Sequence, residues 1–238
     1  MITDVAGVRV GHADDPVALT GVTVVLCDRP AVCGVELRGG ANDVLGLDYL
    51  DPRHLVPTVN GIVLGGGSRF GGEAVWGVMR WLEEHGIGFA AGPASVPHVP
   101  GAFLFDLNVG DGKIRPTREM GYAAAARAKA GPVAEGSVGA GSGATLGKLH
   151  GIARAMRGGL GTASTRLDGV VVGALVAVNA VATFAIRRRA RSSPARATPP
   201  TEHGSSTRRT RSSPDTARSG DSPPRSTPRS ASWPPTPG

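Results

Sequence analysis

Residues 136–148 read Gly-Ser-Val-Gly-Ala-Gly-Ser-Gly-Ala-Thr-Leu-Gly-Lys, the most conspicuous local pattern in the chain. A phosphate-binding loop requires a glycine five residues before its Gly-Lys pair and a Ser or Thr after the lysine. Ser142 and Leu149 stand at those two positions, which excludes a nucleoside-triphosphate loop. Residues 139–144 fit the loose dinucleotide pattern, but no clear strand precedes them and Asp168 lies too far along to be the expected acid. A tightly packed strand-loop-helix turn is favoured, and it predicts no special role for Lys148.

The sequence around this segment alternates strands with helices. Apolar runs of strand length occur at residues 22–27, 31–37, 61–64, 103–107 and 169–177. An Asp-Arg-Pro turn is expected at residues 28–30. Apolar residues at helical spacing predict a helix from residue 74 that ends before Gly86, and a second, alanine-rich helix is predicted over residues 120–130. Residues 1–181 therefore belong to the α/β (α+β) class.

The net charge of +7 is unevenly distributed. Residues 182–238 hold 11 of the 26 basic residues, all of them Arg, and only three of the 19 acidic ones. Residues 1–181 are left nearly neutral, with 15 basic and 16 acidic residues, so an electrostatic argument for nucleic acid applies only to the tail. The tail also contains 10 Pro and 11 Ser without strand or helical period, a composition that predicts disorder. A nucleic-acid arm, a solvated tail without a partner, and a wrong reading frame of a GC-rich gene all remain open on composition.

Candidate chemistry elsewhere is sparse. Asn179 ends a predicted strand, where an Asn is either a turn residue or an amide aimed at an oxyanion. The six His lack metal-ligand spacing, and Cys27 and Cys33 fit neither a disulfide framework nor a zinc site. We therefore predict no metal and no cofactor. We expect a cytoplasmic protein, because the N-terminus does not look like a signal peptide and no apolar run has membrane-spanning length.

Seven segments spread over residues 1–181 form a specific combination. They are residues 2–12 (Ile-Thr-Asp-Val-Ala-Gly-Val-Arg-Val-Gly-His), 37–40, 64–71, 77–84, 138–145, 158–164 and 176–181 (Val-Ala-Val-Asn-Ala-Val). Together they resemble the DmpA-type family of L-aminopeptidases/D-esterases, which includes β-aminopeptidases and nylon-oligomer hydrolases. Arg69, Gly72 and Trp76 depart from the small, apolar or acidic residues usual in that family, and we expect them to reshape the pocket rim.

The resemblance implies an αββα sandwich, here incomplete, and N-terminal-nucleophile chemistry. In such enzymes the precursor cuts itself before a Ser or Thr, whose freed amine titrates near pH 8 and serves as general base for its own hydroxyl. Asn179 matches the family's oxyanion-stabilising Asn, and Lys148 matches a lysine near the site in the nylon-hydrolase branch. Phe105 stands where that branch has a Tyr, so it is a candidate substrate-binding residue without a hydroxyl role.

The nucleophile segment that the resemblance requires is absent after Val181. In the family it reads Asn-Thr-Thr-Ile-Gly-Val-Val-Ala-Thr-Asp-Ala. If one base is missing near codon 182, each original codon combines the last base of one present codon with the first two of the next. Residues 226–237 then back-translate, with suitable synonymous codons, to Asn-Thr-Thr-(Ile/Val)-Gly-Val-Val-Ala-Thr-Asp-Ala. This result favours an out-of-frame translation of residues 182–238.

These observations predict two parts. Residues 1–181 form the N-terminal part of a DmpA-type hydrolase domain, and residues 182–238 form the out-of-frame tail. The intact relative would hydrolyse an amide or ester of a small peptide and form homo-oligomers, with neither membrane nor nucleic acid as a partner. This chain is expected to be inactive and to aggregate, because the nucleophile is absent and sheet edges stay open. The alternatives are a neutral domain with a basic nucleic-acid arm and, more weakly, a nucleotide-using enzyme built on residues 136–148.

Overall fold

A five-stranded mixed sheet organises the computed structural model, which describes residues 1–182. The strands lie in the order β1-β2-β4-β7-β3, and only β4 and β7 pair in parallel. Their bounds are Val8–Asp15 (β1), Thr20–Val32 (β2), Val44–Leu45 (β3), Thr58–Gly65 (β4) and Gly101–Phe103 (β7). The predicted tail, apart from its first residue, lies outside the described residues.

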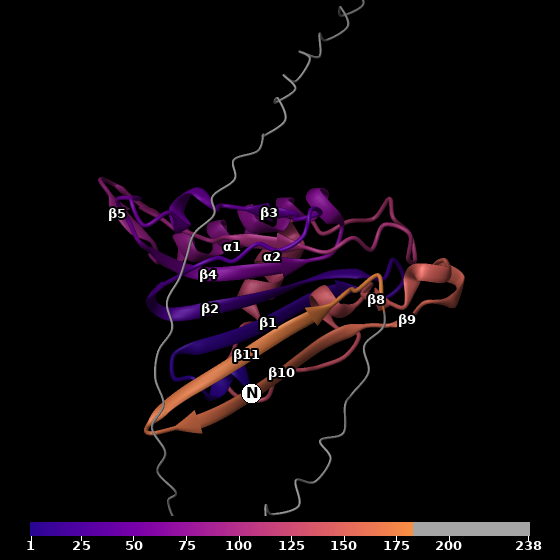
Figure 1. Ribbon diagram of the computed structural model, residues 1–238. Helices are drawn as coiled ribbons and strands as arrows, with labels where there is room; N and C mark the ends of the chain where they lie inside the picture. The colour runs from indigo at the N-terminus through magenta and orange to yellow at the C-terminus, as the bar shows by residue number, and fades with distance from the viewer. Residues whose placement is uncertain (183–238) are drawn as a thin grey trace, which may run out of the picture. The chain divides into compact units, whose positions relative to one another are not determined.

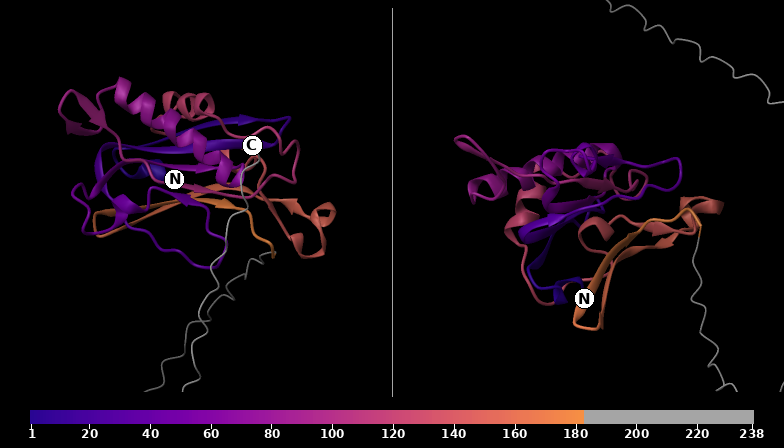
Figure 2. Two further views of the ribbon diagram at one scale, coloured as in Figure 1. Left: turned by 90° about the horizontal axis from the view of Figure 1, so that it is seen from above. Right: turned by 60° about the vertical axis from the view of Figure 1, so that its left-hand side comes forward.

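Two helices, α1 (Glu73–Glu84) and α2 (Arg118–Ala126), cover one face of this sheet (Figure 2). Apolar side chains of α1 at helical spacing pack against the valines of β2 and β4. The buried cluster includes Val22, Val24, Leu26, Val63, Ala74, Val75, Val78, Leu82, Val99 and Phe103. Thr117 caps α2 by accepting the N–H of Met120. The two helices touch backbone to backbone, since a Cβ at Gly77 or Gly121 would overlap a carbonyl oxygen of the other helix.

A long hairpin lies on the opposite side of the sheet from the helices (Figure 2, right). Its strands are β10 (Gly159–Leu167) and β11 (Val170–Val178). Asp168 and Gly169 both have positive φ angles, 48° and 82°, which is the backbone that a tight two-residue hairpin turn requires. The 3-10 helices η1 (Ile2–Asp4) and η4 (Gly139–Gly141) contact the hairpin, which thereby joins the first sheet (Figure 1).

Short elements complete the described residues. The small strands are β5 (Phe89–Ala91), β6 (Ala94–Val96), β8 (Thr145–Leu146) and β9 (Met156–Arg157). The remaining 3-10 helices are η2 (Asp48–Leu50), η3 (Ser68–Gly72), η5 (Lys148–His150) and η6 (Ile152–Arg154). Within residues 1–182, no helix combines the length and the apolar character needed to cross a membrane.

The structure corrects four local predictions. Residues 28–30 lie inside β2 rather than in a turn, because the strand absorbs them in a register shift between Leu26 and Ala31. Residues 33–37 are consequently not a strand. The strand predicted at residues 103–107 ends at Phe103, and the alanine-rich helix begins at Arg118 and ends at Ala126. The predicted helix from residue 74 and the strands at residues 61–64 and 169–177 are confirmed.

One face of the hairpin is apolar and exposed. Val170, Val172 and Val176 project from alternate positions of β11 and are 61%, 56% and 52% exposed. The opposite face carries Thr162 and Ser164, which hydrogen-bond to the N-terminal segment. An exposed apolar strand face favours association with other chains.

Replacing two of these valines, Val172→Thr and Val176→Thr, is expected to reduce self-association without unfolding the hairpin. Threonine keeps the β-branched side chain that a strand favours while lowering the apolar area. Sedimentation velocity over a concentration series measures the effect. Val171→Thr, on the other face of β11, is the matched control and should lower stability without reducing association. Equal association of the double variant and the unaltered chain would contradict the prediction.

Candidate functional site

Asn179 follows β11 directly and lies at the centre of a polar cluster. The structure brings together the three residues that the sequence singled out, although they come from separate parts of the chain. Lys148 opens η5, after the glycine-rich segment, and Phe105 follows β7. Lys148 also contacts the chain just beyond Asn179, because its backbone N–H donates to the carbonyl of Val181 at 2.7 Å.

Hydrogen bonds fix the direction of the Asn179 amide. Its Oδ1 accepts the backbone N–H of Thr145 at 2.9 Å and the Lys148 ammonium at 2.8 Å. Its Nδ2 donates to the carbonyl of Phe105 at 2.8 Å. An amide turned over would place NH₂ against two donors and an oxygen against a carbonyl, so only this orientation satisfies its neighbours. The second Nδ2 hydrogen forms no hydrogen bond to any described residue and can donate to a bound group.

Lys148 strengthens this donor. Its Nζ also donates to the backbone carbonyl of Asn179 at 3.2 Å, so the ammonium holds both oxygens of that residue. Partial burial lowers the pKa of Lys148 because the charged form loses hydration. A cation on Oδ1 polarises the amide and makes the Nδ2 hydrogens better donors to a developing negative charge. Lys148 thus takes part in the cluster, which the simple packing interpretation of residues 136–148 did not predict.

Phe105 joins the cluster through its main chain. Its carbonyl orients Asn179, while its ring is 53% exposed and carries no hydroxyl. The backbone contact does not depend on the side chain, so a Phe serves it as well as a Tyr would.

The glycine-rich segment offers no cradle for phosphates. Gly139 N–H donates to the carboxylate of Asp14, and Ala140 N–H donates to the hydroxyl of Thr23. Further along the segment, the N–H of Thr145 donates to the Asn179 side chain and the N–H of Lys148 donates to the carbonyl of Val181. A phosphate loop needs such N–H groups free. The segment therefore serves close backbone packing, which argues against the dinucleotide alternative.

Sequence reasoning missed two participants. Thr145 contributes a backbone N–H, which no side-chain pattern could reveal. Asp106, only 2% exposed, accepts the N–H of Gly67 and the hydroxyl of Thr20 directly beside Phe105. An acid at the end of an apolar run was the available signal for Asp106, but the prediction of a continuous strand over residues 103–107 concealed it.

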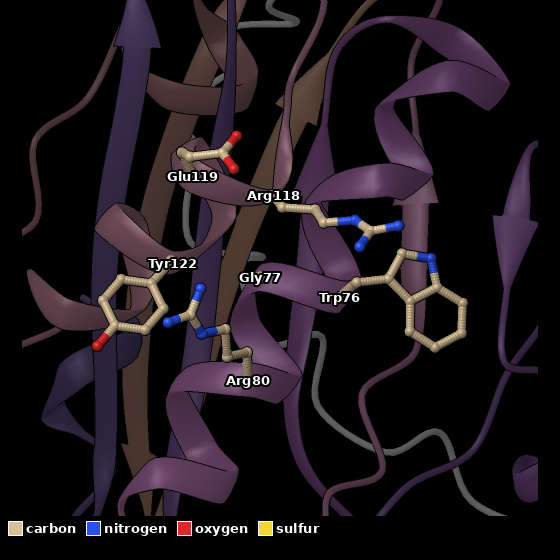
Figure 3. Close-up of a pocket in the computed structure, with 6 residues that line it drawn as sticks. All are labelled: Trp76, Gly77, Arg80, Arg118, Glu119 and Tyr122. Atoms are coloured by element: carbon tan, nitrogen blue, oxygen red, sulfur yellow. The ribbon is translucent and has the colours of Figure 1, made fainter.

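A separate surface pocket of about 560 Å³ lies on the outer face of the helices (Figure 3). It is lined by Trp76, Gly77, Arg80, Arg118, Glu119 and Tyr122. Glu84 engages two of its walls, accepting from Arg80 at 2.8 Å and from the Tyr122 hydroxyl at 2.6 Å. Trp76 therefore shapes this pocket and not the surroundings of Asn179. Among residues 1–182, no cluster of three or more His, Cys, Asp or Glu side chains is arranged to hold a metal ion.

Comparison with known proteins shows which family the chain resembles. The sequence profile of Peptidase family S58 matches residues 1–206. The uncharacterized aminopeptidase Rv1333 of Mycobacterium tuberculosis is 48% identical over 188 residues, which cover 75% of this chain and 52% of that protein. The chain therefore spans about half the length of the curated relatives it matches.

Solved structures show the same fold. A β-aminopeptidase from Burkholderia sp. superimposes with a TM-score of 0.57 at 29% identity, over 75% of this chain and 51% of that one. The L-aminopeptidase D-Ala-esterase/amidase of Ochrobactrum anthropi, described as a variant of the Ntn hydrolase fold, gives 0.59 at 24% identity over 75% and 52%. The expected fold class is confirmed, and with it the resemblance: this chain belongs to Peptidase family S58.

Proposed function

We propose that residues 1–181 are the N-terminal part of a self-cleaving aminopeptidase in which Asn179 stabilises the oxyanion. The observation that carries this proposal is the Asn179 amide, whose direction is fixed by its hydrogen bonds and which keeps one N–H available among the described residues. Attack on an amide or ester carbonyl puts negative charge on its oxygen, and a preorganised N–H stabilises that charge. The names of the relatives, aminopeptidase and β-aminopeptidase, agree with small peptides or amides as substrates.

The nucleophile is the part that this chain lacks. After Val181 the sequence contains no Asn-Thr-Thr segment in the present frame, whereas the frame one base away yields one from residues 226–237. We infer that residues 182–238 are translated out of frame and that the chain as it stands neither cleaves itself nor forms an acyl-enzyme. The profile match extends past Val181 to residue 206. Sequencing of the gene is therefore the measurement that locates the codon of the shift.

Location and assembly follow the same line of inference. A cytoplasmic location agrees with two free cysteines, Cys27 and Cys33. Homo-oligomers are expected of the intact relative.

The purified chain is expected to stay a single polypeptide by mass spectrometry and to leave amino-acid p-nitroanilides unhydrolysed. Turnover by this chain would overturn the inference that its nucleophile is missing.

The charge of the tail supports one alternative, a nucleic-acid-binding arm. Its 11 Arg would neutralise phosphates and make binding strongly salt-dependent. Deletion of residues 182–238 distinguishes the two accounts. The out-of-frame account expects only weak, sequence-independent binding that serves no function, whereas the alternative expects specific binding that is lost on deletion.

A further inference from the structure

Asp106 is a buried carboxylate beside the Asn179 cluster that the proposed chemistry does not use. Its Oδ1 accepts the N–H of Gly67 at 2.6 Å, and its Oδ2 accepts the hydroxyl of Thr20 at 2.9 Å. The residue before it is Phe105, whose carbonyl orients Asn179. The Asp106 side chain thus links the start of β2 and the turn after β4 to Phe105, the residue whose carbonyl contacts the Asn179 amide.

The turn after β4 shows what the carboxyl group of Asp106 does. It links a strand to the N-terminus of α1 through glycines, an arrangement whose N–H groups commonly bind a phosphate. Here the Gly67 N–H points at the Asp106 carboxylate, and the Ser68 N–H donates to the carbonyl of Leu104. Gly67 and Ser68 both have positive φ angles, 79° and 51°. The chain closes this strained turn with a carboxyl group of its own, so the turn is not available to a ligand.

The glycine-rich segment packs on the same carboxylate. A Cβ at Gly143 would lie 2.7 Å from Oδ2 of Asp106, and a Cβ at Gly66 would overlap that oxygen. The residues that follow Gly143 include Thr145 and Lys148, whose backbone N–H and ammonium group donate to Oδ1 of Asn179. Asp106 therefore contacts both structures that hold Asn179, the Phe105 carbonyl on one side and the Gly143 turn on the other.

We propose that Asp106 is a positioning residue that sets the direction of the Asn179 amide through Phe105 and the Gly143 turn. The proposal takes its catalytic meaning from the proposed function of Asn179, whereas the contacts can be tested in this chain without any catalysis. Loss of the carboxylate frees the Gly67 turn and the Phe105 carbonyl together, and Asn179 loses its fixed acceptor.

Titration of Asp106 provides a specific readout. Burial raises its pKa, and the hydrogen bonds from Gly67 and Thr20 oppose this effect. Its contacts within the described residues, Thr20, Gly66, Gly67 and Gly143, carry no ionisable side chain. Because the folded state takes up this proton more readily than the unfolded state, the contribution of Asp106 to stability grows as pH falls through its raised pKa and is lost as pH rises. Asp106→Asn removes that dependence.

The experiment records the side-chain amide signals of Asn179 by NMR in the full chain, from neutral to acidic pH. Asn179→Asp assigns the signals. In the unaltered chain they are expected to shift with the same midpoint as the Asp106 carboxyl carbon. In Asp106→Asn they are expected to start displaced and to lose that transition. Asp14→Asn is the matched control, because Asp14 also accepts a backbone N–H, that of Gly139 at 3.2 Å, but does not contact Phe105.

Unchanged Asn179 signals in Asp106→Asn, or a transition that persists there, would overturn the proposal. If Asp106→Asn does not fold, the titration of the unaltered chain is the test. Different midpoints for the Asp106 carboxyl carbon and the Asn179 amide signals would then overturn the proposal. A frame-restored protein without hydrolytic activity would refute the proposed function, yet it would leave this spectroscopic test standing.

Discussion

Insertion of one base near codon 182 is expected to turn an inert chain into a self-cleaving hydrolase. The restored frame would supply the Asn-Thr-Thr segment encoded across residues 226–237, read on for as long as the frame stays open. A free N-terminal Thr then combines a nucleophilic hydroxyl with an amine that titrates near pH 8.

Mass spectrometry and p-nitroanilide hydrolysis measure this change. The restored chain is expected to separate into two fragments at the Asn-Thr bond and to turn over substrate, whereas the present chain is expected to do neither. Replacing the first Thr of the restored segment by Ala is the control and should block both steps. A restored chain that folds but neither cleaves nor hydrolyses would show that the frame account is wrong.

Asn179→Ala in the frame-restored enzyme is expected to lower kcat by a factor of about 10²–10³, with little change in KM. This is the typical cost of removing one preorganised donor to an oxyanion, because that contact forms fully only in the transition state. Steady-state kinetics on the processed enzyme measures it.

Two further variants separate chemistry from folding. Asn179→Ala leaves the Thr145 N–H and the Lys148 ammonium without their acceptor, so part of its effect could be structural. Asn179→Asp keeps the acceptor oxygen but lacks the N–H donor, and it is expected to be as inactive as the alanine variant while melting closer to the parent. Lys148→Met keeps the amide and should lose less activity. An Asn179→Ala enzyme with unchanged kcat would remove Asn179 from the oxyanion site.

The fold was predictable where local pattern decides structure. The helix α1 was identified correctly because its apolar residues recur at helical spacing and Gly86 follows its end. The strand β2 was divided wrongly because Pro30 normally interrupts strands, whereas here a register shift accommodates it. The strand predicted at residues 103–107 stops at Phe103, since the next residues turn to bring Phe105 to Asn179 and Asp106 to Gly67.

The site was only partly predictable. Asn179 and Lys148 were identified through family resemblance, and the structure places the Lys148 ammonium 2.8 Å from the Oδ1 of Asn179. Asp106 and Thr145 escaped because their roles depend on contacts between residues distant in sequence. Local propensity contains no information about which turn a buried carboxylate will close or which backbone N–H will meet an amide.

The bases of the gene at codons 226–228 test the central claim most directly. For the shifted frame to encode Asn-Thr-Thr, the third bases of the codons for Ser226, Thr227 and Pro228 must all be A. All three are synonymous positions in the present frame, so nothing in this protein requires them. We predict A at each, together with an open shifted frame back to codon 182. A base other than A in the Ser226 codon, or a base other than A or T in the Thr227 codon, would contradict the account, because the shifted frame would then encode no Asn followed by Thr or Ser.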